Sequence, residues 1–253
     1  MAREGVIGVY PVLDNAIAVV AESTWTAQKA LDDMDVTWTP PEGTPFSTSK
    51  ALPNYAALFD AAEVNVLNED ETFTADWDRA TKTVEAVYET PYLAHVCMEP
   101  MGCTALYEES ETDDAEDASI TVWSPSQSIG QSASQAGKIA GVKKENVQVH
   151  ATLMGGGFGR RADMDFVRQA TSIAMNLPGT PIKLTWSREE DVQQDTYRPA
   201  TASRFKAGLD DDGNITALDF VIVGKPVSAD FNTRNGTFVM FEAKDDISMV
   251  MPM

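Results

Sequence analysis

The sequence predicts an α+β fold whose strands and helices fall into two separate parts of the chain. Short apolar runs rich in β-branched residues alternate with helix-like stretches from Val6 to about residue 225. Three prolines within Pro40–Pro45 interrupt this pattern, because proline cannot continue a helix or a central strand. A hydrophobic content of 43% and a charged content of 23% over 253 residues are typical of a globular protein with a sizeable core.

A β-hairpin is expected at the front of the chain. Val6–Val12 and Ala16–Val20 are apolar runs rich in strand-forming residues. The pair Asp14-Asn15 between them is typical of a tight turn, because both side chains tolerate turn conformations. We therefore expect these two runs to pair as antiparallel strands.

A helix and a third strand are expected to complete the first part as a small βαβ-type unit. Ser23 or Thr24 supplies a side-chain oxygen that can cap a helix reaching about Leu31. Val36–Trp38 then returns to an extended pattern. This part is expected to occupy residues 1–45 and to end at the proline-rich linker.

The longer part of the α+β fold is expected over residues 77–230. Residues 46–76 before it predict a connector with one short helix near Asn54–Ala62. Strands are expected at Thr83–Tyr88, Ala105–Tyr107, Ile120–Trp123, Val147–Thr152, Ile182–Trp186, Ser203–Leu209 and Ile215–Val223, and helices at Gln127–Ile139 and Asp163–Met175. The acidic tract Glu108–Asp117 predicts a solvated loop, and residues 231–253 predict an irregular tail.

Two short signals fix element boundaries within this part. Ser187, followed three residues later by Glu190, forms a capping-box pattern at the start of a helix. The tract Asp210–Asn214 contains a glycine and lies between two strand patterns, so it predicts a hairpin turn.

The charge balance argues against a nucleic-acid partner. The sequence has 19 lysines and arginines against 39 aspartates and glutamates, a formal net charge of −20. Such a surface repels phosphate backbones, and the nearest basic cluster, Arg160-Arg161, is only two residues long. We interpret the acidity as a solvated surface in preference to an acidic partner site.

Cysteine content and hydrophobicity predict a soluble protein with free thiols. Cys97 and Cys103 are too few for a disulfide scaffold. No apolar run reaches the roughly 20 residues needed to cross a bilayer, so no transmembrane segment is expected. The first residues lack the apolar core of a signal peptide.

The most informative motif is the glycine-rich segment Met154–Arg161, with the sequence MGGGFGRR. Consecutive glycines let the backbone approach a ligand closely, and exposed N–H groups before a helix can hold an anion. Phe158 adds a flat apolar wall, and the two arginines are potential phosphate donors. The spacing matches neither a dinucleotide-binding fingerprint nor a phosphate-binding Walker loop. A plain glycine turn with solvated arginines is an equally good interpretation at this level.

Two other segments contain residue types that carry chemistry. His95–Thr104 holds a histidine, two cysteines and Glu99, but it lacks the paired spacing of a zinc site. We therefore expect it to pack against the core, with Glu99 accepting backbone hydrogen bonds, and we interpret His150 as structural. Tyr197 and Arg198 can position a substrate, although a surface ion pair explains them equally well.

Five segments, taken in order, resemble the xanthine-oxidase family of molybdenum hydroxylases. The resemblance is to the subgroup of isoquinoline 1-oxidoreductase beta subunits and aldehyde dehydrogenase molybdenum-binding subunits, and it extends over residues 5–225. It is carried by Leu93–Ala105, Trp123–Gln127, Met154–Arg161 with Asp165-Phe166, Trp186–Asp191 and Tyr197–Ala200.

The resemblance implies a fold and a cofactor site. Residues 1–45 would be the C-terminal part of a hammerhead-like α/β domain, and residues 77–230 the first half of a molybdopterin-binding α+β domain. A family glutamine lies about thirty residues before the phenylalanine of the glycine loop, and Gln127 precedes Phe158 by 31 positions. The implied cofactor-binding residues are Gln127, Gly156, Gly157, Phe158, Gly159 and, as a weaker candidate for a pterin or nucleotide phosphate, Arg160.

The resemblance also implies an activity for a larger parent protein. Family members hydroxylate aldehydes or aromatic N-heterocycles with water as the oxygen source, using molybdenum-molybdopterin, in some members its cytosine dinucleotide form. Purine specificity is not implied, because Arg160-Arg161-Ala162 stands where xanthine-type members have a glutamate. The family's general-base glutamate lies in a Gly-x-Gly-Glu segment that this sequence lacks. We expect no catalytic residue and no direct metal ligand in the chain.

The chain is therefore expected to be a fragment that is inactive alone. Its expected partners are an iron–sulfur subunit, the missing C-terminal half of the subunit and a small aldehyde or N-heterocycle substrate. We expect the isolated chain to hold no cofactor. Twin-arginine export signals in the subgroup suggest a periplasmic parent. The alternative is a catalytically silent module that binds a ligand or a partner.

Overall fold

The computed structural model describes residues 3–13, 16–39, 42–43, 47–60, 70–227 and 231, together with the backbone of 65–66 and 249–250. It divides into two compact units, each built from two stretches of the chain. Unit 1 comprises Met1–Pro41 and His95–Thr196, and unit 2 comprises Glu42–Ala94 and Tyr197–Met253. The predicted turn at Asp14-Asn15, most of the proline-rich linker and nearly all of the predicted tail lie outside the described residues.

Unit 1 begins with the predicted hairpin and helix. Strands β1 (Val6–Val12) and β2 (Ala16–Ala21) pair antiparallel. Helix α1 (Thr24–Asp32) follows, and the Ser23 hydroxyl accepts a hydrogen bond from the Thr26 N–H at 3.1 Å, which confirms the predicted cap.

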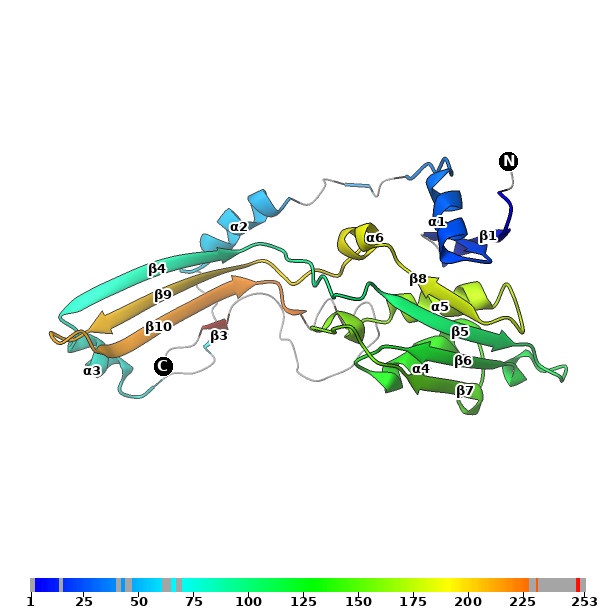
Figure 1. Ribbon diagram of the computed structural model, residues 1–253. Helices are drawn as coiled ribbons and strands as arrows, with labels where there is room; N and C mark the ends of the chain where they lie inside the picture. The colour runs from blue at the N-terminus through cyan, green and yellow to red at the C-terminus, as the bar shows by residue number, and fades with distance from the viewer. Residues whose placement is uncertain are drawn as a thin grey trace. The chain divides into compact units, whose positions relative to one another are not determined.

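A four-stranded sheet forms the centre of unit 1 (Figure 1). Its order is β7-β6-β5-β8, and only β6 and β7 run parallel. The strands are β5 (Gly102–Glu108), β6 (Ser119–Ser124), β7 (Val147–Ala151) and β8 (Ile182–Thr185). This confirms the strands predicted in this region. Short 3-10 turns lie at Ala115–Asp117, Lys144–Asn146 and Arg160–Ala162.

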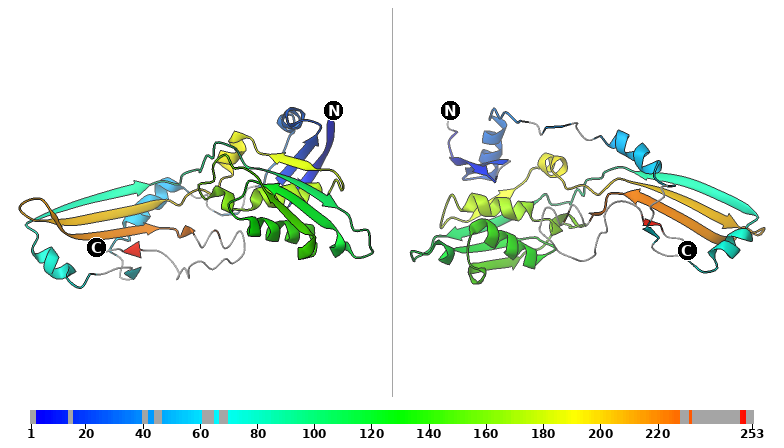
Figure 2. Two further views of the ribbon diagram at one scale, coloured as in Figure 1. Left: turned by 60° about the horizontal axis from the view of Figure 1, so that its bottom comes forward. Right: turned by 180° about the vertical axis from the view of Figure 1, so that it is seen from behind.

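Two helices cover one face of this sheet, as Figure 2 shows for α4 (Ile129–Ala140) and α5 (Asp165–Ala174). Alternation along β5 and β6 directs Cys103, Ala105, Ile120 and Val122 toward the helices, and all four are buried. Apolar residues of α5 and Val12 of the hairpin join them in one core. The glycine-rich segment between β7 and α5 is therefore anchored at both ends to packed elements.

Helix α6 (Arg188–Gln193) lies at the C-terminal end of unit 1. The Ser187 hydroxyl accepts the Glu190 N–H at 3.0 Å, which confirms the cap that the sequence pattern predicts. Arg188 bonds the Asp191 carboxylate at 2.6 Å and the carbonyl oxygens of Cys97 and Met98 at 2.6 and 2.8 Å. These bonds tie the helix to the segment that contains His95.

Unit 2 is built on three long antiparallel strands (Figure 1). They are β4 (Lys82–Thr90), β9 (Thr201–Leu209) and β10 (Ile215–Gly224), and the sheet order is β3-β11-β10-β9-β4 with the short strands Asn65–Val66 and Met249–Val250. Helices α2 (Thr48–Ala56) and α3 (Phe73–Asp78) pack against β9 and β10.

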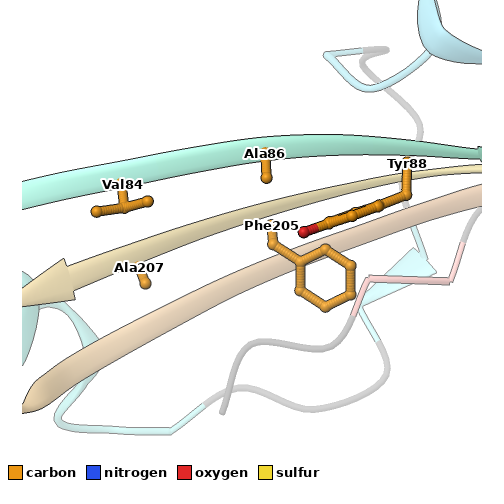
Figure 3. A pocket seen from close by; sticks show the side chains of 5 residues that line it. All are labelled: Val84, Ala86, Tyr88, Phe205 and Ala207. Carbon is orange, nitrogen blue, oxygen red and sulfur yellow. The ribbon is translucent and has the colours of Figure 1, made fainter.

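The two faces of this sheet differ. On the covered face, Phe59 packs with buried residues of β9 and β10. The other face carries a shallow apolar trough lined by side chains of β4 and β9, as Figure 3 shows. Its lining residues are Val84, Ala86, Tyr88, Phe205 and Ala207.

Two predictions of local structure are wrong, and one helix was not predicted. Val36–Trp38 has no regular structure, because the hairpin sheet contains only β1 and β2 and offers it no partner strand. The connector helix runs over Thr48–Ala56, not Asn54–Ala62, and contains Pro53. Tyr55 and Ala56 at its end pack on the unit 2 core, and this packing outweighs the proline. Helix α3 was not predicted within the connector.

Both cysteines are free and buried, as predicted. Burial raises the pKa of the Cys103 thiol to about 12 from the ordinary 9.0.

We expect Ellman's reagent at pH 8 to label neither thiol in the folded protein and both after unfolding. Because the unfolded thiol loses its proton first, the contribution of Cys103 to stability falls as the pH rises from about 9 toward 12. Equal labelling rates for Cys103 in the folded and unfolded protein would contradict the expectation that its thiol is protected by burial.

None of the described helices combines the length and the apolar character needed to span a membrane. Likewise, no group of three or more His, Cys, Asp or Glu residues in the described part of the chain is arranged to hold a metal ion.

Candidate functional site

The glycine-rich segment forms an exposed loop in unit 1 and is held there by Glu99. The Gly155 N–H donates to the Glu99 carboxylate at 2.9 Å, and the Glu99 N–H donates to the Gly155 carbonyl at 3.2 Å. This confirms the prediction that Glu99 accepts backbone hydrogen bonds. The segment containing His95 and the glycine loop, which are about sixty residues apart in the sequence, therefore lie side by side.

Internal packing explains two of the glycines. A β-carbon on Gly155 would lie 2.4 Å from the Glu99 β-carbon, and one on Gly157 would lie 2.7 Å from the Gln127 Cδ. Gly156 and Gly159 have φ angles of 99° and 96°, which disfavour any residue with a β-carbon. The backbone of this loop therefore packs directly against the side chains of Glu99 and Gln127.

Gln127 is exposed and its side-chain amide has a defined orientation. Its Oε1 accepts the Gly159 N–H at 3.0 Å, so its Nε2 is the free end and a hydrogen-bond donor. The Gln127 backbone N–H donates to the Arg161 carbonyl at 3.0 Å. This bond places Gln127 in the loop region, and helix α4 begins only at Ile129 with Ser128 as its cap residue, two residues later than predicted.

The glycine loop contains hydrogen-bond donors that the described part of the protein does not pair. The backbone N–H groups of Gly156, Gly157 and Phe158 have no acceptor among the residues that the structure describes. Phe158 is 66% exposed and adopts a φ of 53°, which is uncommon for a bulky side chain. Three successive amides and the Gln127 Nε2 can together receive an oxygen-rich group.

The two arginines point into the protein, so neither is a solvated surface residue. Arg160 is 1% exposed and makes two hydrogen bonds to the Asp165 carboxylate, at 3.0 and 2.7 Å. Its Nε lies 3.0 Å from Asp195, and its guanidinium lies over the Trp186 ring at 5.4 Å from the centroid. Its donors are thus directed at the protein's own carboxylates.

Arg161 is fully buried beneath the loop. Its Nε donates to the Gly156 carbonyl at 2.8 Å, and one terminal nitrogen donates to the Glu99 carbonyl at 2.7 Å and the Glu99 carboxylate at 3.0 Å. A single guanidinium therefore joins the two segments. The sequence pattern singles out Arg161 as a cation but gives no sign that it is buried.

His95 and Asp195 form a second buried contact beside the loop. The His95 N–H and its Nδ1 both bond the Asp195 carboxylate, with Nδ1 at 3.0 Å from Oδ1. Asp195 is 1% exposed at its side chain and also pairs with Arg160. The sequence gives no sign that the Asp195 side chain has this role. Tyr197 and Arg198 belong to unit 2.

Residues adjoining the loop are strained or buried in ways typical of binding sites. Val96 has a φ of 47°, an outlier for a β-branched residue, and is 49% exposed. Cys97 is buried, and its thiol lies 3.4 Å from the Gly157 carbonyl. Burial raises the pKa of the Cys97 thiol, which keeps it protonated and inert at neutral pH.

Residues 58–233 match the family model of the molybdopterin cofactor-binding domain. The chain belongs to this family. The match contains all of unit 1's glycine loop and the segments that hold it. The resemblance to xanthine-oxidase-family molybdenum-binding subunits is thereby confirmed.

Relatives of this molybdopterin cofactor-binding chain include molybdenum-binding subunits of oxidoreductases. The aldehyde oxidoreductase molybdenum-binding subunit PaoC of Escherichia coli is 28% identical over 159 residues, which cover 63% of this chain and 20% of that protein. Isoquinoline 1-oxidoreductase subunit beta of Brevundimonas diminuta is 34% identical over 103 residues, covering 40% of this chain and 13% of that protein.

A solved structure shares the fold. Quinoline 2-oxidoreductase from Pseudomonas putida aligns with a TM-score of 0.57 and 21% identity, covering 83% of this chain and 27% of that one. The molybdopterin cofactor-binding chain thus spans about a quarter of the length of this structure and about a fifth of the length of PaoC.

The loop fits part of a molybdopterin. The cofactor carries phosphate and ring oxygens, which are acceptors, and the loop offers the unpaired N–H groups of Gly156, Gly157 and Phe158 with the Gln127 Nε2. Phe158 supplies an exposed ring beside these donors. The unpaired donors of the loop are thus compatible with the acceptor atoms of a molybdopterin.

Proposed function

We propose that this chain supplies one wall of the molybdopterin site in a molybdenum hydroxylase subunit. Gln127 and the loop Gly156–Gly159 would contact the cofactor, in its plain or cytosine dinucleotide form. The run of unpaired donors at Gly156, Gly157 and Phe158, next to the oriented Gln127 amide, carries this proposal. Arg160 would support the loop from beneath, because its guanidinium bonds Asp165 and Asp195.

The complete protein would hydroxylate aldehydes or aromatic N-heterocycles, with water as the oxygen source. When bound, the cofactor would supply the redox chemistry, and an iron–sulfur subunit would remove the electrons. The residues of this chain would bind the cofactor, exclude water with Phe158 and orient one oxygen through Gln127. The chain has no Gly-x-Gly-Glu segment, so the proton acceptor of the reaction would come from outside it. The chain alone is expected to be inactive.

A second candidate is a catalytically silent module that binds a ligand or partner. The same missing Gly-x-Gly-Glu segment favours it. Either candidate is compatible with the proposed domain boundaries, which are a hammerhead-like piece over residues 1–45 and a partial cofactor domain over residues 77–230. Either is also compatible with a periplasmic location.

Co-expression separates the two candidates. The chain would be produced with neighbouring reading frames that encode a Gly-x-Gly-Glu segment and an iron–sulfur protein. The hydroxylase proposal predicts a complex that contains this chain, molybdenum by mass spectrometry and pterin by fluorescence, and that oxidises aldehydes or quinoline. If the chain is recovered without the co-expressed proteins and without molybdenum, or if no such reading frames exist, the silent module would be favoured.

A further inference from the structure

His95 lies beside the glycine loop with one ring nitrogen committed to the protein and the other available. Asp195 accepts the His95 backbone N–H and lies 3.0 Å from Nδ1. It also accepts its neighbour Thr196 N–H at 2.7 Å and pairs with Arg160 at 3.0 Å. Because an ionised carboxylate only accepts hydrogen bonds, Nδ1 must carry the proton.

The other nitrogen, Nε2, faces Gly159. A β-carbon at Gly159 would lie 3.9 Å from His95 Nε2, and no other described atom outside Gly159 and its two chain neighbours comes within 4 Å of that position. Within the described part of the chain, Nε2 has no hydrogen-bond partner. In the neutral ring with a proton on Nδ1, Nε2 is an acceptor.

This acceptor complements the loop. The unpaired groups at Gly156, Gly157, Phe158 and the Gln127 amide are all donors. A ligand that bonds both the loop donors and the His95 Nε2 acceptor must carry acceptors and at least one donor. A pterin ring has both, since its carbonyl and ring nitrogens accept and its amino and ring N–H groups donate.

We propose that His95 is a ligand-binding residue, whose Nε2 accepts a hydrogen bond from the pterin on the glycine loop while Asp195 fixes its tautomer. This inference rests on the proposed function, because it assumes that the loop holds a pterin. It assigns a binding role to a residue whose sequence context predicts only packing against the core.

Two substitutions separate the binding role from the structural one. His95→Asn keeps a side-chain N–H near the position of Nδ1, so it retains the bond to Asp195 and loses Nε2. His95→Gln places an amide near the position of Nε2 and loses the Asp195 bond. Thermal denaturation of each variant verifies that it is folded. Nitrogen NMR of the ligand-free wild type is expected to show a protonated Nδ1 and an unprotonated Nε2.

The affinity for neopterin monophosphate, measured by pterin fluorescence, provides the test. We expect His95→Asn to bind about tenfold more weakly than wild type, the loss of one hydrogen bond, and His95→Gln to recover part of that loss. Wild-type affinity in folded His95→Asn would overturn the inference and leave the proposed function standing. Absence of binding by the wild type would instead contradict the proposed function, and the inference with it.

Discussion

Replacement of Arg161 by alanine is expected to lower the free energy of unfolding by about 2 to 5 kcal/mol, the range typical of truncating a large, fully buried side chain to alanine. The guanidinium is fully buried and bonds the Gly156 carbonyl as well as the carbonyl and carboxylate of Glu99. Its removal leaves a cavity, takes the donor away from two partly buried carbonyls and separates the loop from the His95 segment. Urea denaturation measures the change.

A matched control is available in Arg79, which pairs with Asp76 but has a side chain that is 70% exposed. Exposed ion pairs contribute little, so Arg79→Ala is expected to change stability by less than about 1 kcal/mol. An Arg161→Ala protein as stable as Arg79→Ala would show that the loop does not depend on this arginine.

Substitution of Gly155 by alanine is expected to destabilise the protein by about 1 to 3 kcal/mol, the usual cost of overpacking. The new β-carbon would lie 2.4 Å from the Glu99 β-carbon and 3.2 Å from its backbone nitrogen, so the loop or the Glu99 segment must move. Urea denaturation gives the free energy, and the dispersion of the loop amides in NMR spectra shows whether the loop has shifted.

Gly130 is the corresponding control, because a β-carbon there meets nothing within 4 Å and the residue lies in helix α4. Gly130→Ala is expected to stabilise the protein by about 0.4 to 1 kcal/mol, through a smaller loss of backbone entropy on folding. If both alanine variants were equally stable, close packing at Gly155 would not constrain the loop.

These contacts determine which substitutions report on a ligand. A β-carbon on Gly156 would lie 2.8 Å from the Phe158 ring, and the φ of Gly156 is 99°. A valine there disturbs the loop whether or not a ligand is present. Gln127 and His95 are better positions, since their side chains end at the loop without forming the core.

Local signals in the sequence predicted most elements of the fold. Alternating apolar residues gave β5 and β6, and the capping pattern at Ser187 gave the start of α6. The error at Val36–Trp38 has a different origin, because a strand requires a neighbour that only the tertiary structure provides. The discontinuity of the two units could not be predicted either, since their segments join through contacts distant in sequence.

The candidate site was predictable as a set of residues but not as a set of contacts. Resemblance to relatives pointed to Gln127 and the glycine loop, and the structure places the Gln127 amide on the Gly159 N–H. The burial of Arg160 and Arg161 was not predictable, because adjacent arginines are normally solvated. Asp195, one carboxylate partner of Arg160, lies about 35 residues further along the chain, and sequence spacing alone does not reveal such a pair.

The most direct measurement is an NMR titration of the chain with neopterin monophosphate, which maps the backbone amides that respond. The proposed role of the loop predicts saturable shifts that centre on Gly156, Gly157, Phe158 and the Gln127 side-chain amide, with weak affinity because the chain supplies only one wall of the site. A Gln127→Ala variant should retain the fold and show smaller shifts. Shifts that centre elsewhere, or none at millimolar ligand, would contradict the claim that this loop is a cofactor-binding surface.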